Sequence, residues 1–154
     1  QRSPNISCIE SYPVFQSAFF TQLVSHGVFN AILTGNCHEG ALLKLRQTKL
    51  ETFFQLESSF FADINQWRRE TIMENAVKQF GVEKTLVIGD TFRDYSLAKH
   101  FGLKSVLLDW RKDPSLDTLV DFEYVTIFKE RQIISGDLLD FLIDYATKFK
   151  SNGE

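Results

Sequence analysis

Two carboxylates follow an apolar run in the middle of the chain, at a spacing that suits a metal ion. The run 85–88 ends in Gly89, and Asp90 and Asp94 follow, four residues apart. If the run is a strand and a helix begins shortly after it, both carboxylates can face one crevice. Mg²⁺ prefers oxygen ligands and usually takes one or two protein carboxylates. The alternative is that Asp90 or Thr91 caps the helix and Asp94 interacts with its positive end.

A second candidate site follows the apolar run 28–33. Thr34, Gly35 and Asn36 form a turn signal there. A hydroxyl group and free backbone N–H groups at the start of a helix make an anion site, so these residues are candidates to bind phosphate. The alternative is a plain strand-to-helix turn in which Thr34 or Asn36 is the cap.

Both sites require strands that end beside one another. Apolar runs predict strands at 28–33, 85–88 and 104–108, with shorter ones at 53–56 and 124–125. Helices are predicted at 13–26, 37–48, 63–80 and 93–101, and at 135–149 with Ser135 as the N-cap. Continuous apolar strands that alternate with helices indicate an α/β fold, a doubly wound parallel sheet. Ligands of such folds bind at the carboxyl ends of the strands, where we expect Thr34 and Asp90 to lie close together.

The composition bounds the size and class of the protein. The 154 residues are the length of one ordinary domain, which we place at 13–150, between an irregular segment at 1–12 and a tail at 151–154. The net charge of −3 argues against nucleic acid as a partner, and no apolar run is long enough to span a membrane. The two cysteines fit neither a metal-ligand spacing nor a disulfide scaffold, so the cytoplasm is the expected compartment.

The order of the motifs resembles the haloacid-dehalogenase-like (HAD) superfamily, in its phosphoglycolate-phosphatase-like branch. The resemblance rests on Thr34-Gly35-Asn36 and Gly89-Asp90-Thr91-Phe92-Arg93-Asp94, with Lys44-Leu45, Phe61-Ala62-Asp63 and Ala98-Lys99, and it extends from Tyr12 to Tyr145. It implies that Thr34, Gly35 and Asn36 bind phosphate and that Asp90 and Asp94 hold Mg²⁺. It also implies a basic side chain that positions the phosphate. Lys44 and Arg69 are the candidates, with Arg68 and Lys84 as weaker ones, although the Lys-x-x-Pro form often seen for this element is absent. The alternative is a solvated helix face for Lys44 and an ion pair on the helix surface for Arg69.

The nucleophile motif of that superfamily, Asp-x-Asp-x-Thr on the central strand, does not occur in these residues. The resemblance implies an Mg²⁺-dependent phosphohydrolase that acts on a small phosphorylated metabolite, a phosphomonoester, through an aspartyl-phosphate in an intact parent protein. We expect the 154-residue chain alone to be inactive. One alternative is a catalytically inactive HAD-like binding or scaffold domain. Another is a receiver-like doubly wound domain, for which Asp109 is the nearest phosphoacceptor candidate, although the Trp-Arg-Lys after it does not support that role.

Overall fold

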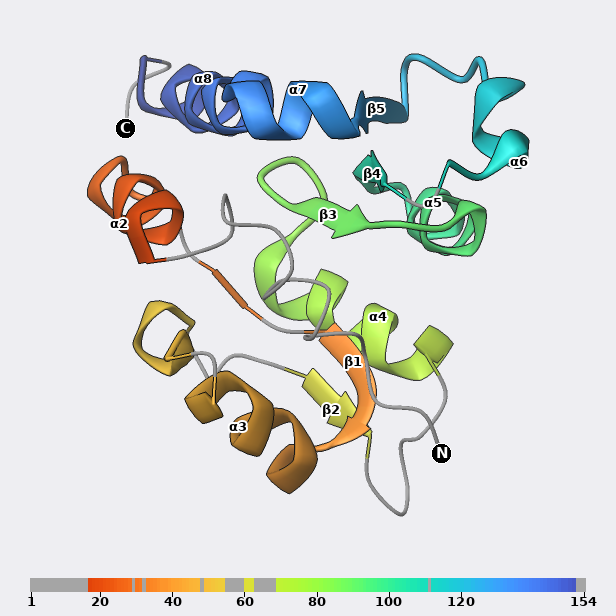
Figure 1. Ribbon diagram of the computed structural model, residues 1–154. Helices are drawn as coiled ribbons and strands as arrows, with labels where there is room; N and C mark the ends of the chain where they lie inside the picture. The colour runs from red at the N-terminus through yellow and green to blue at the C-terminus, as the bar shows by residue number, and fades with distance from the viewer. Residues whose placement is uncertain are drawn as a thin grey trace. The chain divides into compact units, whose positions relative to one another are not determined.

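The computed structural model describes residues 17–28, 30–31, 33–47, 49–54, 60–62, 69–110 and 112–151 (Figure 1). The chain forms two compact units. One comprises Gln1–Ala76 together with Leu139–Glu154, and the other comprises Val77–Leu138. The boundaries fall within helix α4 (Arg69–Phe80) and near the start of helix α8 (Asp137–Ser151). Each unit has a parallel sheet of its own.

The first unit is built around two short parallel strands. Strand β1 (Leu33–Cys37) pairs with strand β2 (Phe60–Ala62). Helix α3 (His38–Gln47) starts directly after β1, and a short 3-10 helix, η1 (Glu51–Phe53), follows it. Helix α2 (Ser17–Ser25) lies against η1, where the ring of Phe20 stacks on that of Phe53 with 5.9 Å between centroids. Such aromatic pairs add to the free energy of apolar burial.

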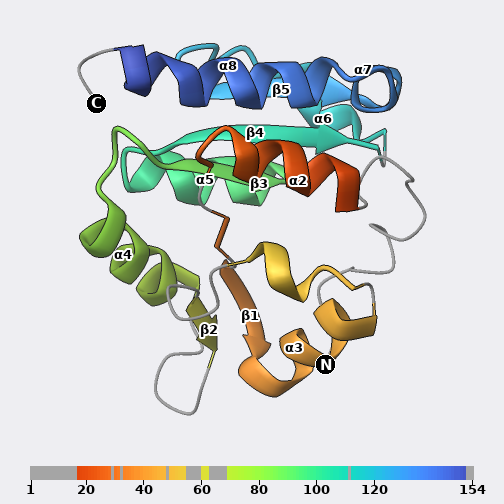
Figure 2. The same cartoon turned by 90° about the vertical axis from the view of Figure 1, so that its left-hand side faces the viewer.

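The second unit has a three-stranded parallel sheet in the order β3-β4-β5, formed by Leu86–Gly89, Lys104–Asp109 and Val125–Lys129. Helix α5 (Phe92–His100) connects β3 to β4 and packs against both strands (Figure 2). Helix α6 (Pro114–Asp117) lies in the connection from β4 to β5. Helix α7 (Glu130–Ser135) follows β5 and contacts β4 and β5.

One face of this sheet carries a buried apolar cluster. Tyr95 of α5, Leu107 of β4, Leu116 of α6 and Val125 of β5 form it. Burying each large apolar side chain contributes roughly 1.5–3 kcal/mol to the free energy of unfolding. Side chains two residues apart in a strand point to the same face, so the side chain of Asp109 lies on the same face of the sheet as that of Leu107. The cluster therefore fixes the position of the end of β4, and with it the position of the Asp109 carboxylate.

The prediction of an α/β fold with parallel strands is confirmed. The strands predicted at 85–88 and 104–108 are β3 and β4, which pair in parallel with Leu86 opposite Lys104. The strand predicted at 124–125 is longer and forms β5. The strand predicted at 53–56 was wrong in its described part, because Phe53 ends η1 and Phe54 is its C-cap.

The strand predicted at 28–33 was wrong in position. Thr34, Gly35 and Asn36 lie inside β1, so they do not form a turn after it. The register of β1 against β2 shifts between Thr34 and Cys37. A glycine within a strand often marks such an irregularity, which explains why these residues imitate a turn in the sequence.

Most predicted helices are confirmed, with one correction near the C-terminus. Helices α3 and α5 match their predicted ranges to within one residue at each end, and α4 ends at Phe80 as predicted. Ser135 is not an N-cap, because it is the last residue of α7, and Gly136 separates α7 from α8. Gly136 has φ 101° and its N–H donates to the carbonyl of Gln132, a left-handed helix end that glycine adopts readily. The segment 1–12 and the beginnings of the helices predicted at 13–26 and 63–80 lie outside the described residues. Within the described part of the chain, no helix has both the length and the apolar character needed to cross a membrane.

Candidate functional site

Charged side chains mark the carboxyl ends of all three strands in the second unit. Asp90 follows β3, Asp109 is the last residue of β4, and Lys129 is the last residue of β5. Because the strands are parallel, their carboxyl ends share one edge of the sheet. Ligands of open α/β folds bind at that edge, so these side chains are the first candidates for chemistry.

The turn after β3 is organised by a capping box. Thr91 is the N-cap of α5, and its hydroxyl oxygen accepts a hydrogen bond of 3.3 Å from the Asp94 N–H. In return, Oδ2 of Asp94 accepts hydrogen bonds from the Thr91 N–H at 3.1 Å and the Thr91 hydroxyl at 2.8 Å. The N–H of Asp90 donates to the same oxygen at 3.2 Å. The helix-capping alternative is thus confirmed for Thr91 and Asp94.

Gly89 permits the side chain of Asp94 to lie this close to the end of β3. A Cβ atom placed on Gly89 would lie 2.5 Å from the Cβ atom of Asp94. That separation is far shorter than the about 3.5–4.0 Å that two carbon atoms prefer. The glycine is therefore required by the contact with Asp94, and it lets the carboxylate reach the backbone of Asp90 and Thr91.

Asp90 itself is half-buried and faces the end of the neighbouring strand. The indole Nε1 of Trp110, directly after β4, donates to Oδ2 of Asp90 over 3.4 Å, a long hydrogen bond. The backbone N–H of Asp90 is held by Asp94. Asp90 is thus a carboxylate fixed at the carboxyl end of a parallel strand, in the position predicted for a metal ligand.

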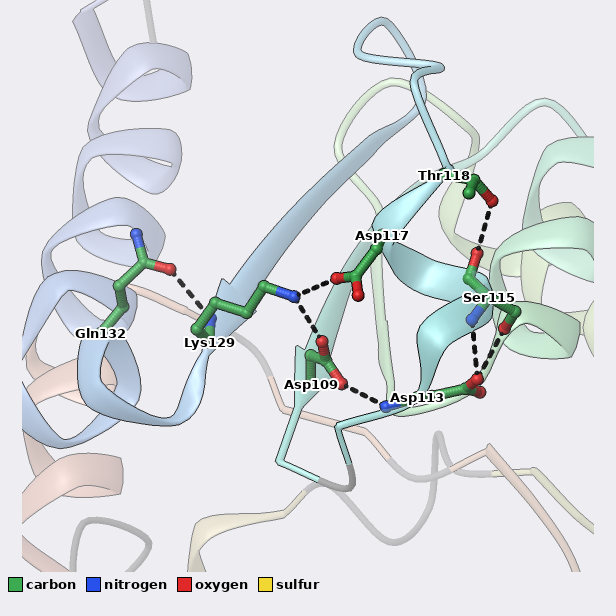
Figure 3. A network of polar contacts seen from close by, with 7 residues as sticks. All are labelled: Asp109, Asp113, Ser115, Asp117, Thr118, Lys129 and Gln132. Carbon is green, nitrogen blue, oxygen red and sulfur yellow. Dashed lines mark hydrogen bonds and ion pairs between the residues drawn. The ribbon is translucent and has the colours of Figure 1, made fainter.

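The most deeply buried carboxylate of this edge is Asp109, which is 3% exposed. Its Oδ2 accepts a hydrogen bond of 2.6 Å from Nζ of Lys129, and the same Nζ donates to Oδ1 of Asp117 at 2.7 Å (Figure 3). Asp109 and Lys129 are opposite each other in the register of β4 and β5. One lysine therefore bridges a buried carboxylate and an exposed one.

The loop from β4 to α6 closes around Asp109. Its Oδ1 accepts a hydrogen bond of 3.0 Å from the Asp113 N–H. Asp113 then caps α6, with its side chain accepting from the Ser115 N–H at 3.0 Å, and Pro114 occupies the first helical position. Lys112 adopts φ 55°, in the left-handed region that non-glycine residues seldom occupy. Asp109 thus positions a loop as well as a lysine.

The electrostatics of this pair favour both charged forms. Burial alone would raise the pKa of Asp109. Hydrogen bonds from Lys129 and from the N–H of Asp113 outweigh burial, so the pKa of Asp109 lies below its ordinary value. The hydrogen bonds to Asp109 and Asp117 raise the pKa of Lys129. The site therefore favours a positively charged Lys129 beside a negatively charged Asp109.

A second polar cluster ties α5 to the segment before β5. The Tyr95 hydroxyl donates to Oδ2 of Asp121 at 2.6 Å, and Lys99 Nζ donates to the same oxygen at 2.7 Å. The Lys99 ammonium also lies 5.3 Å from the centre of the Tyr124 ring, within cation–π range. Each group is satisfied by another, so the cluster is structural.

The predicted site residues are divided between the two units. Asp90 and Asp94 come together after β3 in the second unit. Thr34, Gly35 and Asn36 lie within β1, Lys44 lies within α3, and Arg69 opens α4, all in the first unit. The closeness of Thr34 to Asp90 stays a prediction. Among the described residues, no three or more Asp, Glu, His or Cys side chains are grouped to hold a metal ion.

Sequence reasoning missed Lys129 and dismissed Asp109. The signal was present, because each ends an apolar stretch with a charge: Leu107-Leu108-Asp109 and Ile127-Phe128-Lys129. Opposite charges at the ends of two consecutive parallel strands are expected to meet if the strands are neighbours. That condition depends on the strand order, which the apolar pattern does not contain.

Comparisons of the chain with protein-family models, with curated proteins and with solved structures gave no match.

Proposed function

We propose that the chain is the core of a HAD-like, Mg²⁺-dependent phosphohydrolase that acts on a small phosphomonoester. The observation that carries the proposal is the turn Gly89-Asp90-Thr91, at the carboxyl end of a parallel strand. Asp90 stands at the strand end with its backbone held by Asp94. This is the place that the resemblance gives to the acidic metal motif.

In this proposal Asp90 is the Mg²⁺ ligand, and the two carboxylates are not equivalent. Oδ2 of Asp94 already accepts three hydrogen bonds, so in this proposal Asp94 positions Asp90 and Thr91. Mg²⁺ would offset the negative charge of the phosphate. Phosphate oxygens would be bound by Thr34, Gly35 and Asn36, and Lys44 or Arg69 would position them. The aspartyl nucleophile would come from residues other than these.

In this proposal a further strand, from residues other than these, completes a doubly wound core. Strand β1 pairs with β2, and β3 pairs with β4, which pairs with β5. Among the described residues no ladder joins β1 to β3. The resemblance implies a central strand that carries Asp-x-Asp-x-Thr, and no such motif occurs in these 154 residues. A strand at the edge of a sheet has backbone N–H and C=O groups without strand partners on one side, so a strand beside β3 would pair with them in this proposal.

A catalytically inactive HAD-like binding or scaffold domain is the second candidate. The use of Asp94 as a helix cap favours it, because this carboxylate has a structural role without any metal. The two candidates differ in whether a nucleophile motif accompanies the chain.

The test is a phosphatase assay on the protein expressed from its complete reading frame, with an aryl phosphate and a Mg²⁺ titration. We expect Asp90→Asn to abolish turnover, whereas the control Asp140→Asn, at an exposed position of α8, leaves it unchanged. Turnover by Asp90→Asn at low Mg²⁺ would exclude the metal assignment. Absence of turnover together with absence of Asp-x-Asp-x-Thr would favour the scaffold. Turnover by the 154-residue chain alone would overturn the proposal that the nucleophile lies elsewhere.

A further inference from the structure

A pocket of about 400 Å³ opens at the carboxyl ends of β4 and β5, outside the predicted site. The described residues that line it are charged: Asp109, Lys112, Asp117, Lys129, Glu130 and Arg131. All of them belong to the second unit. Most small-molecule sites are lined mainly by apolar groups. Charged groups at the ends of these side chains instead suit a small, strongly polar ligand.

Three of these charged side chains form ion pairs with one another. Lys129 lies between Asp109 and Asp117, at 2.6 and 2.7 Å. The side chains of Lys112, Glu130 and Arg131 take part in no hydrogen bond or ion pair in the part of the chain that the structure describes. Within the described residues, two cations and one carboxylate therefore line the pocket without partners.

The loop that carries Lys112 contains a strained backbone conformation. A non-glycine residue in the left-handed region costs on the order of 1 kcal/mol. The backbone N–H of Asp113, directly after Lys112, donates to the carboxylate of Asp109, which is itself buried. Backbone strain that the surroundings maintain is typical of ligand sites. Arg131 lies in the first turn of α7, two residues after Lys129.

We propose that this pocket binds a small oxyanion that still carries a proton, of the hydrogen phosphate type. Lys112 and Arg131 supply positive charge, and the planar guanidinium of Arg131 can donate two parallel hydrogen bonds to such an anion. The carboxylate of Glu130 can only accept a hydrogen bond. The Glu130 carboxylate can therefore accept a hydrogen bond from an anion that has an O–H group, and it repels an anion that has none. This site is distinct from the metal position at Asp90 and adds to the proposed phosphohydrolase.

The preference for an anion with an O–H group can be tested by calorimetric titration of the 154-residue chain at neutral pH. Inorganic phosphate retains an O–H group under these conditions, and sulfate does not. We expect phosphate to bind about tenfold more tightly than sulfate, the factor for about 1.4 kcal/mol. Lys112→Gln and Arg131→Gln should each weaken phosphate binding about tenfold, since each removes a charged hydrogen-bond donor. Glu130→Gln should reduce the preference for phosphate, because an amide can donate to sulfate.

Lys104→Gln is the matched control. Lys104 is an exposed lysine of the same strand, β4, at its amino end, so its loss should leave phosphate binding unchanged. Lys112 and Arg131 are exposed, so their variants should fold, which circular dichroism would check. Equal affinity for phosphate and sulfate would mean an adventitious ion only and would overturn the proposal. Equal weakening by Lys104→Gln and Lys112→Gln, or no phosphate binding by the chain, would overturn it too.

Discussion

The Nζ atom of Lys129 lies 2.6 Å from Oδ2 of Asp109, a residue that is only 3% exposed. The two residues face each other at the ends of neighbouring parallel strands. A carboxylate buried to this depth is tolerated when it is paired and hydrogen-bonded, and Asp109 has both a cation and a backbone N–H as partners. The side chain of Lys129 is 48% exposed, so water still solvates the cation. The pair joins the end of β4 to the end of β5.

Lys129→Met should destabilise the protein. Methionine keeps the apolar stem and removes the charge, which leaves Asp109 buried without its cation. We expect a loss of about 2–3 kcal/mol in the free energy of unfolding, less than for a fully buried pair because water can reach the site. Urea unfolding would measure it. Lys104→Met, at an exposed lysine of β4, is the control and should change stability by about 0.5 kcal/mol or less. Equal losses in both variants would contradict the role of the pair.

The lowered pKa of Asp109 predicts an acid-dependent contribution to stability. Burial opposes ionisation, but the hydrogen bonds from Lys129 and Asp113 outweigh it and hold the folded pKa below that of the unfolded chain. The pair therefore contributes fully above the ordinary aspartate pKa of about 3.9, and its contribution is lost as the pH falls through the folded pKa. Asp109→Asn should be less stable than wild type at neutral pH, and the gap in Tm should narrow on acidification. A gap that stays constant from neutral to acid pH would contradict this linkage.

The parts of the fold that could be predicted depend on local pattern, and the parts that could not depend on pairing between distant residues. The apolar run before Gly89 predicts β3, and the helix that ends before Gly102 is α5. Thr34-Gly35-Asn36 was misplaced because a register shift against β2 produces the same residue types as a turn. The pairing of Asp109 with Lys129 depends on strand order, since the residues are twenty positions apart in the chain. Asp94 illustrates a third case, because the same spacing suits a metal ligand and a helix cap.

Asp121→Asn should lower the pKa of the Tyr95 phenol. The hydrogen bond that Tyr95 donates to Asp121 is the largest cause of its raised pKa, and burial adds to it. The amide accepts more weakly and carries no charge, so ionising the phenol becomes easier. The phenolate absorbance followed through an alkaline titration would report the change, with Glu123→Gln, at an exposed neighbour, as the control. Indistinguishable titration curves for wild type and Asp121→Asn would show that this hydrogen bond does not control the pKa of Tyr95.

Gly89→Ala should destabilise the protein although alanine suits a strand better than glycine does. The new methyl group would lie 2.5 Å from the Cβ atom of Asp94, so either the strand end or the first turn of α5 must move. Overpacking of this kind costs about 1–3 kcal/mol. Thermal melting would measure the loss. The double variant Gly89→Ala, Asp94→Gly removes the clash and should show a favourable coupling energy. Additive losses would show that the contact does not constrain residue 89.

Asp94→Ala and Asp90→Asn should separate the structural carboxylate from the candidate metal ligand. Oδ2 of Asp94 accepts three hydrogen bonds that fix the start of α5, so Asp94→Ala should cost about 1–2 kcal/mol of stability without any metal present. Asp90→Asn keeps an oxygen that can accept from the Trp110 indole, and it removes one of two negative charges at the strand end. Because like charges in one place repel, its stability without metal should equal that of wild type or slightly exceed it. Thermal melting in the presence of a chelator compares the three proteins. A loss in Asp90→Asn as large as that in Asp94→Ala would make Asp90 a structural residue as well, and it would remove the reason for assigning it to Mg²⁺.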